Sequence, residues 1–363
     1  MIVYPEEFNT KKKAVFDALS DVAGGGQRLW VIPLSILGWP ETRDRVEVAL
    51  ARAKKPGRSR LARALKRVLL AGQYNWARRY FSKHPDRIAV AWNGLTGSRK
   101  VFLDAARDAG AAALHAELAP LPGRITLDPV GVNAESSVPR DQVFFGQYHG
   151  QAWREMGQGL QARASRRADV RQGFGPLPDT KFLFCPLQVP DDSQVRLFSG
   201  WCGGYRGFVA ALTEAVGHLP PGWHLRLKEH PSAKDSVADL LEPLLATGRA
   251  VLDNETDSFA QVAGSAGVVT LNSSMGLQAF FHDKPVVVLG RAMFDLPGLV
   301  SRCQSQIELN TVFAGAAELS FDQPLRDGFM TWLDQSYYPR FSSTGFDREA
   351  FAMKLAAAAQ RPG

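Results

Sequence analysis

Short apolar runs alternate with amphipathic segments over most of the chain. In the C-terminal half, residues 181–187, 223–227, 267–271 and 285–289 are apolar runs of strand length, and residues 203–218 and 276–282 have the pattern of helices. Alternation of buried strands with helices is typical of a parallel α/β sheet. We therefore expect a Rossmann-like domain whose ligands bind beyond the carboxyl ends of its strands.

The N-terminal half shows the same alternation. Helices are predicted at 10–23, at 41–71 with an interruption at Pro56-Gly57, and at 99–109, and buried strands at 28–37, 87–92 and 112–116. The strand, Gly-containing turn, helix and strand between 87 and 116 form one Rossmann-like unit. Residues 118–139 are rich in Pro and Gly and are expected to form an ordered loop, and residues 141–173 are polar and helical in character.

These elements predict the α/β fold class, with two Rossmann-like domains facing a central cleft. The Gly- and Pro-rich stretch 173–178 is interpreted as the linker between them. The expected boundaries are 1–175 for the first domain and 176–335 for the second, and a chain of 363 residues is long enough for both. Residues 336–363 contain a last predicted helix at 347–360 and are expected to pack back on the first domain.

The formal charge of +7 is concentrated between Arg43 and Arg87. Such a basic block could attract an anionic membrane surface, an acidic polysaccharide or nucleic acid, and a solvated helix face is an equally good interpretation. The chain has no nucleic-acid module signature, so no nucleic-acid partner is predicted. Near a membrane each basic residue contributes about 1 kcal/mol, which would hold the protein loosely at the inner membrane.

The remaining composition favours a cytoplasmic protein. The first residues lack the basic start and apolar core of a signal peptide, and the apolar run 29–39 is about half of the ~20 residues that a spanning helix needs. This run is expected to be a buried strand and turn. Cys185, Cys202 and Cys303 are scattered without metal-ligand spacing, which suits a reducing compartment, and no metal site is predicted.

A candidate phosphate site begins where the strand 223–227 ends. Lys228 and His230 lie on the same side of an extended chain, and Pro231 fixes the direction of the loop. Together the two side chains could neutralise a phosphate, although a surface loop would read the same way. A second triplet, Lys83-His84-Pro85, precedes a strand and is given no role, so the short motif alone is weak.

The second part of this candidate site is the segment 272–276. Ser273 and Ser274 open a predicted helix, where their hydroxyls could cap the helix and the free N–H groups could bind a phosphate. Gly276 would let the backbone approach a ligand closely. With the residues at 228–231, these groups predict a nucleotide-sugar site.

Two carboxylates end strands in the two halves of the chain. Asp192 follows the strand 181–187, and Glu117 follows the strand 112–116. If they face each other across the cleft, one could attack or stabilise an anomeric carbon while the other moves a proton. Asp191 beside Asp192 is an alternative nucleophile. The non-catalytic interpretation of this pair is that the two carboxylates are solvated or cap a helix.

Taken together, the motifs resemble the bacterial capsule-polysaccharide synthesis proteins that act as retaining β-Kdo transferases. The resemblance rests on the order and spacing of Glu117–Arg140, Pro186-Leu187-Gln188 with Asp192-Ser193-Gln194, Lys228–Pro231, and Asn272–Leu277 with Lys284-Pro285-Val286. Two positions depart from the pattern: Leu118-Ala119-Pro120 follows the glutamate, and Gln278 stands where a glutamate is common.

The resemblance implies a GT-B glycosyltransferase, with CMP-Kdo on the C-terminal domain and a surface glycan or glycolipid acceptor on the N-terminal domain. It implies that Asp192 is the nucleophile of a covalent Kdo adduct and Glu117 the acid/base. Neither a metal nor another cofactor is implied. The remaining roles by this resemblance are donor binding by Gln188, Lys228, His230, Pro231, Asn272, Ser273, Ser274 and Gly276, and acceptor binding by Asn93 and Gly94.

Three alternatives stay open. Asp192 gives retention only if it reaches the anomeric carbon opposite CMP; beside the acceptor hydroxyl it would be a base and the outcome inversion. The donor could be another CMP-linked nonulosonic acid or another nucleotide sugar. A non-catalytic module that holds an anionic glycan or membrane through the basic block would leave the segments at 188, 230 and 273 unexplained. The acceptor, the linkage and the oligomeric state are not predicted.

Overall fold

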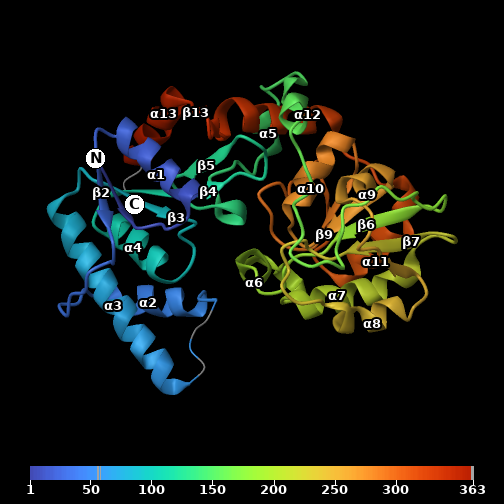
Figure 1. Ribbon diagram of the computed structural model, residues 1–363, viewed down its shortest axis with the longest axis horizontal. Helices are drawn as coiled ribbons and strands as arrows, with labels where there is room; N and C mark the ends of the chain where they lie inside the picture. The colour runs from blue at the N-terminus through green and yellow to red at the C-terminus, as the bar shows by residue number, and fades with distance from the viewer. Residues whose placement is uncertain (55–56, 58, 361–363) are drawn as a thin grey trace. The chain divides into compact units, whose positions relative to one another are not determined.

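The computed structural model describes residues 1–54, 57 and 59–360, which form two compact units (Figure 1). Unit 1 comprises residues 1–119, 123–138 and the chain from 335 onward, and unit 2 comprises 120–122 and 139–334. The predicted boundary at 175/176 therefore differs from this division, which assigns 139–175 to unit 2. Pro56 of the predicted helix break and Lys55 and Arg58 of the basic block lie outside the described residues.

The sheet of unit 1 is parallel except at one edge. Its strand order is β2-β1-β3-β4-β5, and β5 pairs antiparallel with β4. The order reverses between β1 and β3, so the carboxyl ends of these two neighbouring strands form the topological switch point of the unit. The strands are β1 (Ile2–Pro5), β2 (Gly26–Leu29), β3 (Ile88–Trp92), β4 (Ala112–Leu118) and β5 (Ile125–Asp128).

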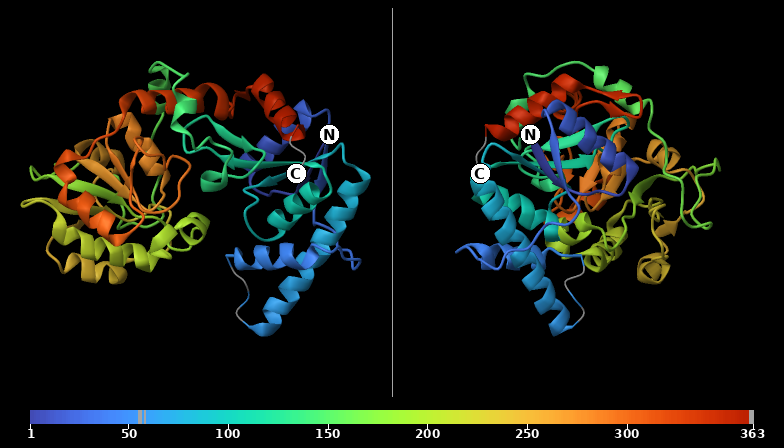
Figure 2. Two further views of the ribbon diagram at one scale, coloured as in Figure 1. Left: turned by 180° about the vertical axis from the view of Figure 1, so that it is seen from behind. Right: turned by 60° about the vertical axis from the view of Figure 1, so that its left-hand side comes forward.

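The helices of unit 1 cover both faces of this sheet because its strands are apolar on both (Figure 2). Alternate residues such as Val90 and Leu114 face one core with α1 and α13, and Ala89 and Ala113 face the other core with α2, α3 and α4. The helices are α1 (Thr10–Val22), α2 (Thr42–Ala51), α3 (Arg60–Lys83), α4 (Gly97–Asp108) and α13 (Arg348–Ala359), with a small hairpin of β12 (Phe341–Ser342) and β13 (Gly345–Phe346).

The C-terminal segment belongs to unit 1 through specific contacts. Phe351 and Leu355 of α13 are buried in the core of its sheet. The hydroxyl of Tyr337 donates to the buried carboxylate of Asp128 at 2.9 Å, and the same carboxylate accepts three backbone N–H groups from the turn after β5. The last part of the chain thus completes one face of a sheet that begins at residue 2.

Unit 2 is a fully parallel sheet of order β11-β10-β9-β6-β7-β8. In chain order this is the six-stranded Rossmann arrangement, whose two halves meet between β6 and β9. The strands are β6 (Phe182–Pro186), β7 (His224–Lys228), β8 (Ala250–Leu252), β9 (Gly267–Thr270), β10 (Val286–Val288) and β11 (Ser301–Arg302).

Helices α7, α8 and α11 pack on one face of this sheet around Leu183, Leu225, Val269 and Val287. On the other face, α9 and α10 lie along β6, β9 and β10 (Figure 1). The helices of unit 2 are α5 (Gln142–Phe145), α6 (Ser193–Phe198), α7 (Tyr205–Ala215), α8 (Ala238–Leu245), α9 (Ser258–Gly264), α10 (Ser274–Gln278), α11 (Gln306–Ala314) and α12 (Gln323–Trp332), and α10 continues as the 3-10 turn η5 (Ala279–His282).

Four expectations about local structure need correction. The strand β1 was not predicted, and the loop 118–139 contains the strand β5. The predicted buried strand at 28–37 ends at Leu29, and the rest of that run is a largely exposed loop. Residues 141–173 contain only short helical turns, because their backbone is bonded to other segments of unit 2, for example Arg166 N–H to Pro231 O at 2.8 Å. Within the described residues, no helix combines the length and apolarity needed to cross a bilayer.

Candidate functional site

The switch point of unit 2 joins two of the predicted residues directly. Gln188 follows β6 and Asn272 follows β9, and their side chains lie together because these strands are neighbours. The Gln188 amide donates to Asn272 Oδ1 at 2.9 Å and accepts from the Asn272 backbone N–H at 3.2 Å. Asn272 Nδ2 in turn donates to the carbonyls of Gln194 and Phe198, at the two ends of α6. One amide pair thus ties the two halves of the sheet to α6.

The helix start at Ser273 is formed as predicted. The Ser273 hydroxyl caps α10 by accepting from the Met275 N–H at 3.2 Å, and its own N–H donates to the hydroxyl of Thr270 at 2.9 Å. Ser274 is exposed at the first turn of the helix. Gly276 is buried, and a Cβ there would lie 2.9 Å from the ring of Phe294. A side chain at this position would therefore crowd the packing beneath the helix, and the close approach of a ligand to Gly276 stays a prediction.

Asp192 lies at the start of α6, beside this amide pair. Its carboxylate accepts from the backbone N–H of Gln194 at 2.9 Å and caps the helix. The side chain is exposed, so a substrate could reach it. The same residue thus has a structural role in the helix and a carboxylate oxygen at the switch point.

His230 follows β7, the next strand of the same sheet edge. Its Nδ1 accepts from the backbone N–H of Ser232 at 3.0 Å, so the neutral ring carries its proton on Nε2. Burial lowers the pKa of His230, with Arg163 acting in the same direction and Asp192 against it. Within the described part of the chain Nε2 has no hydrogen-bond partner, which leaves it as a donor for a ligand. Arg163 was not predicted, and its position near the imidazole comes from the irregular segment before β6.

Lys228 has a different role from the predicted one. Its buried ammonium donates to the carbonyls of Arg171, Asn254 and Thr256 at 2.6, 3.0 and 2.7 Å. An ammonium has three N–H donors, and all of them are used by these bonds. The prediction that Lys228 binds the donor phosphate is therefore wrong for this structure. Lys228 instead fixes the 171–173 segment and the loop after β8 to the end of β7.

Pro231 also forms a hydrogen bond with a segment that is distant in sequence. Its carbonyl accepts from the backbone N–H of Arg166 at 2.8 Å. Glu229, two residues before Pro231, is a buried carboxylate that pairs with Arg167 at 2.8 Å and accepts from Asn254 Nδ2 at 2.9 Å. The sequence motif at 228–231 thus combines three residues that hold neighbouring segments with the imidazole of His230.

In unit 1, two side-chain amides donate hydrogen bonds to the other predicted carboxylate, and we call this arrangement the amide clamp. Glu117, at the end of β4, accepts from Nδ2 of Asn93 at 3.1 and 3.2 Å and from Nδ2 of Asn133 at 3.1 Å. Both asparagines adopt positive φ, 60° and 55°, a conformation that asparagine tolerates better than most residues. Asn133 lies within the motif Glu117–Arg140 but was given no role of its own, because only the fold brings its side chain to the carboxylate.

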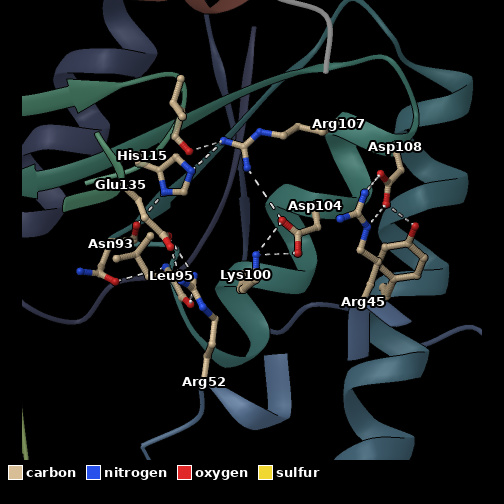
Figure 3. Close-up of polar contacts among 12 residues, drawn as sticks. Arg45, Arg52, Asn93, Leu95, Lys100, Asp104, Arg107, Asp108, His115 and Glu135 are labelled. Atoms are coloured by element: carbon tan, nitrogen blue, oxygen red, sulfur yellow. Dashed lines mark hydrogen bonds and ion pairs between the residues drawn. The ribbon is translucent and has the colours of Figure 1, made fainter. Parts of the chain in front are cut away.

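A buried relay holds Asn93 in this position (Figure 3). Nδ1 of His115 donates to the Asn93 carbonyl at 2.7 Å, and Nε2 accepts from Arg107 at 2.7 Å. Gly94 has φ +74°, and a Cβ there would lie 2.5 Å from Leu103 and 2.6 Å from His115. The glycine therefore makes room for the relay, and Asn93 and Gly94 are joined to Glu117 as one cluster.

The relay predicts a pH dependence of stability. Burial, with Arg107 acting in the same direction, lowers the pKa of His115 from 6.5 to about 4. Between these two pH values the unfolded chain binds a proton that the folded chain does not, so stability falls as the pH falls. From pH 7.5 to pH 5 we expect His115 to account for a loss of about 2 kcal/mol in the free energy of unfolding.

The measurement is urea unfolding of the wild type and of His115→Asn at both pH values. The asparagine keeps a donor near Nδ1 and does not titrate, so its loss on acidification should be smaller by about 2 kcal/mol. Equal losses in the two proteins would contradict a neutral, buried His115.

The two positions that depart from the family pattern, Pro120 with its preceding residues and Gln278, contact each other. The side-chain amide of Gln278 donates to the carbonyl of Pro120 at 2.7 Å. An ionised glutamate has no N–H to donate. The glutamine therefore matches the Leu118-Ala119-Pro120 segment, and it ties residues 120–122 to unit 2.

The structure thus gathers the predicted residues into two clusters. In unit 2, Gln188, Asn272, Ser273, Asp192 and His230 lie at one sheet edge, with hydrogen-bonding side chains and a free carboxylate oxygen around a helix start. In unit 1, Glu117, Asn93 and Gly94 form a clamped carboxylate. The first arrangement suits a small anionic ligand beside a nucleophile, and the second suits proton transfer. Among the described residues, no group of three or more His, Cys, Asp or Glu side chains is placed to hold a metal ion.

Comparison with known proteins supports this interpretation of the fold. Residues 147–327 match the model of the family described as capsule polysaccharide biosynthesis proteins. Protein FixF of Sinorhizobium fredii is 28% identical over 300 residues, 78% of this chain and 72% of that protein. The capsule polysaccharide modification protein LipB of Neisseria meningitidis is 30% identical over 129 residues, 34% of this chain and 31% of LipB.

One solved structure is similar over nearly the full length of the chain. The β-Kdo 2,7-transferase of Thermosulfurimonas dismutans KpsC superposes with a TM-score of 0.55 at 14% identity, over 98% of this chain and 99% of that one. A likeness at this identity shows a shared fold. It confirms the predicted class of two Rossmann-like α/β domains, as in GT-B glycosyltransferases.

Proposed function

We propose, from the premise that residues 147–327 belong to the capsule polysaccharide biosynthesis protein family, that this protein is a retaining glycosyltransferase. It transfers Kdo from CMP-Kdo to a bacterial surface glycan or glycolipid. The choice of Kdo is supported by the activity of the structural relative, a β-Kdo transferase, together with the motif resemblance. The protein would act in the cytoplasm, with no resident cofactor.

The observation that carries the proposal is the cluster at the switch point of unit 2. Gln188 and Asn272 bond to each other across β6 and β9, and a capped helix start, an exposed carboxylate and an imidazole Nε2–H lie around them. CMP has a single phosphate. The Nε2–H of His230 and the N–H groups and Ser274 hydroxyl at the start of α10 would supply its hydrogen bonds.

In the first step of the proposed reaction, a carboxylate oxygen of Asp192 attacks the anomeric carbon of Kdo. The bond from this carbon to the phosphate oxygen breaks, and CMP leaves with the electron pair. In the second step the acceptor hydroxyl attacks the same carbon, Glu117 takes its proton, and the Asp192 carboxylate is released. Two inversions at one carbon give net retention.

The first test is nucleotide selectivity. Saturating CMP at 100 times its Kd should stabilise the protein by about 2.7 kcal/mol and raise the melting midpoint by several degrees, whereas UDP and GDP should not. With CMP-Kdo and an acceptor glycan the protein should release CMP, at a rate that EDTA leaves unchanged. Stabilisation by UDP or GDP but not CMP would replace the proposed donor by another nucleotide sugar.

A loose electrostatic attraction of the basic block Arg43–Arg87 to an anionic membrane remains part of the proposal. The ion pairs of Arg45 with Asp108, Arg52 with Glu135 and Arg67 with Glu47 show that several members of this block are neutralised within unit 1. Charge alone therefore supports a weaker attraction than the residue count suggests.

A further inference from the structure

The outer half of α3 carries an apolar stripe that the described residues of unit 1 leave exposed. Leu61, Leu65 and Val68 are 70%, 63% and 70% exposed, and Leu69 beside them is also exposed. Their spacing of i, i+4, i+7 and i+8 puts all four on one face of the helix, the pattern by which a helix normally packs on a core. The N-terminal half of α3 instead projects beyond the sheet of its unit (Figures 1 and 2).

The loop after β2 extends this apolar surface. Leu34 lies against Gly72, on the same face of α3 one turn beyond Leu69, where a Cβ would be 3.1 Å from the leucine side chain. The backbone N–H of Ser35 donates to the Gly72 carbonyl at 2.9 Å and fixes the loop there. Ile36 is 99% exposed, and Leu37 is exposed beside it. The stripe and the loop thus form one surface, which we call the α3 apolar face: Leu34, Ile36, Leu37, Leu61, Leu65, Val68 and Leu69.

Basic side chains flank this surface. The sequence from Arg60 to Lys83 contains seven Lys and Arg residues and no Asp or Glu. In the exposed half of the helix, Arg60, Arg63, Lys66 and Arg67 lie on the sides that the apolar stripe does not occupy, and Arg67 forms an ion pair with Glu47. A helix with an aliphatic face and a basic opposite face has the pattern of helices that lie in a membrane interface.

We propose that the α3 apolar face docks on the surface of a bilayer that contains anionic lipid. The leucine and isoleucine side chains enter the boundary between head groups and acyl chains, and the flanking Arg and Lys side chains reach the lipid phosphates. A second copy of this chain fits less well, because it would bring two basic, acid-free helices together. The inference goes beyond the proposed reaction and does not depend on which sugar is transferred.

The test is co-sedimentation of the full chain with phosphatidylcholine vesicles that contain or lack phosphatidylglycerol. The wild type should partition to the anionic vesicles, and Leu61→Glu/Leu65→Glu should reduce this partition at least about tenfold, since each buried leucine contributes on that scale. The matched control is Ile307→Glu, which places the same charge at a 78% exposed apolar position on α11 and should bind like the wild type.

A second variant separates the contribution of charge. Arg60→Gln/Arg63→Gln should lose most of the preference for phosphatidylglycerol and most of the salt dependence, while retaining the apolar face. Because the substituted residues are exposed, each variant should keep the circular dichroism spectrum and CMP-induced stabilisation of the wild type.

Three results would overturn the proposal. In the first, the wild type does not sediment with anionic vesicles. In the second, the Leu61→Glu/Leu65→Glu variant sediments like the wild type. In the third, analytical ultracentrifugation shows that this variant loses self-association while its vesicle binding is unchanged. The last result would assign the face to a second copy of the chain. A failed nucleotide test with intact vesicle binding would refute only the proposed reaction.

Discussion

Replacing Asp192 with asparagine is expected to lower the rate of Kdo transfer at least about 10³-fold, because the variant lacks the attacking carboxylate. The free energy of unfolding should hardly change. Asp192 caps α6 by accepting from the Gln194 N–H, and asparagine caps a helix as well as aspartate does. The measurement is CMP release from CMP-Kdo in the presence of acceptor, with thermal unfolding recorded in parallel.

Asp191 supplies the control, since it is an exposed aspartate one residue away that caps no helix. Asp191→Asn should retain the rate of the wild type. If Asp191→Asn is inactive and Asp192→Asn active, the nucleophile is Asp191. If both are active, the covalent mechanism is wrong and a direct displacement with inversion becomes the better proposal.

The second large effect is expected for Glu117→Gln. Loss of a general acid or base typically costs about 10²–10⁴-fold in rate, and Glu117 is proposed to take the proton of the acceptor hydroxyl. In this variant the first step is still possible and the second is slowed. The Kdo adduct of Asp192 should therefore accumulate and be detected by mass spectrometry as a modified peptide containing residue 192.

Two controls keep this result interpretable. Glu349→Gln makes the same substitution at an exposed position of α13 in the same unit and should leave the rate unchanged. The Asp192→Asn/Glu117→Gln double variant should show no adduct. Full activity in Glu117→Gln would show that the amide clamp of Asn93 and Asn133 holds a structural carboxylate, and another group must then move the proton.

The sequence predicted the strands β6, β7, β9 and β10 of unit 2 closely, because parallel strands covered on both faces are nearly continuous apolar runs, but the short strands β8 and β11 were not predicted. The apolar run at 28–37 gives the same signal, yet most of it is exposed beside α3. Hydrophobicity alone does not show what covers an apolar segment. The prediction of helical character for residues 141–173 was wrong for another reason. The backbone of this segment forms hydrogen bonds with residues that are distant in sequence, such as Pro231 and Glu255, and no local sequence pattern indicates such bonds.

The candidate site was predicted only in part, again because local sequence patterns do not show tertiary contacts. Side chains that follow strand ends, such as Gln188 and Asn272, were located correctly because parallel strands place their ends together. Lys228 was misread because its three acceptors lie 26, 28 and 57 residues away in sequence. Asn133 lies within the motif Glu117–Arg140 but was given no role, and Arg163 lies in none of the motifs. Tertiary contacts decided which charged groups remain available.

The return of the C-terminal segment to unit 1 affects the order in which the protein can form. Phe351, Leu355 and Ala358 of α13 belong to a core whose other buried members lie between residues 2 and 127. During translation, the first sheet leaves the ribosome with one side lacking α13 until all of unit 2 has been synthesised. Unit 2 can therefore reach its native state first, which reverses the usual N-terminal-first order of multidomain proteins. Until then the nascent first unit exposes an apolar sheet surface, and this is the stage at which a chaperone would be needed.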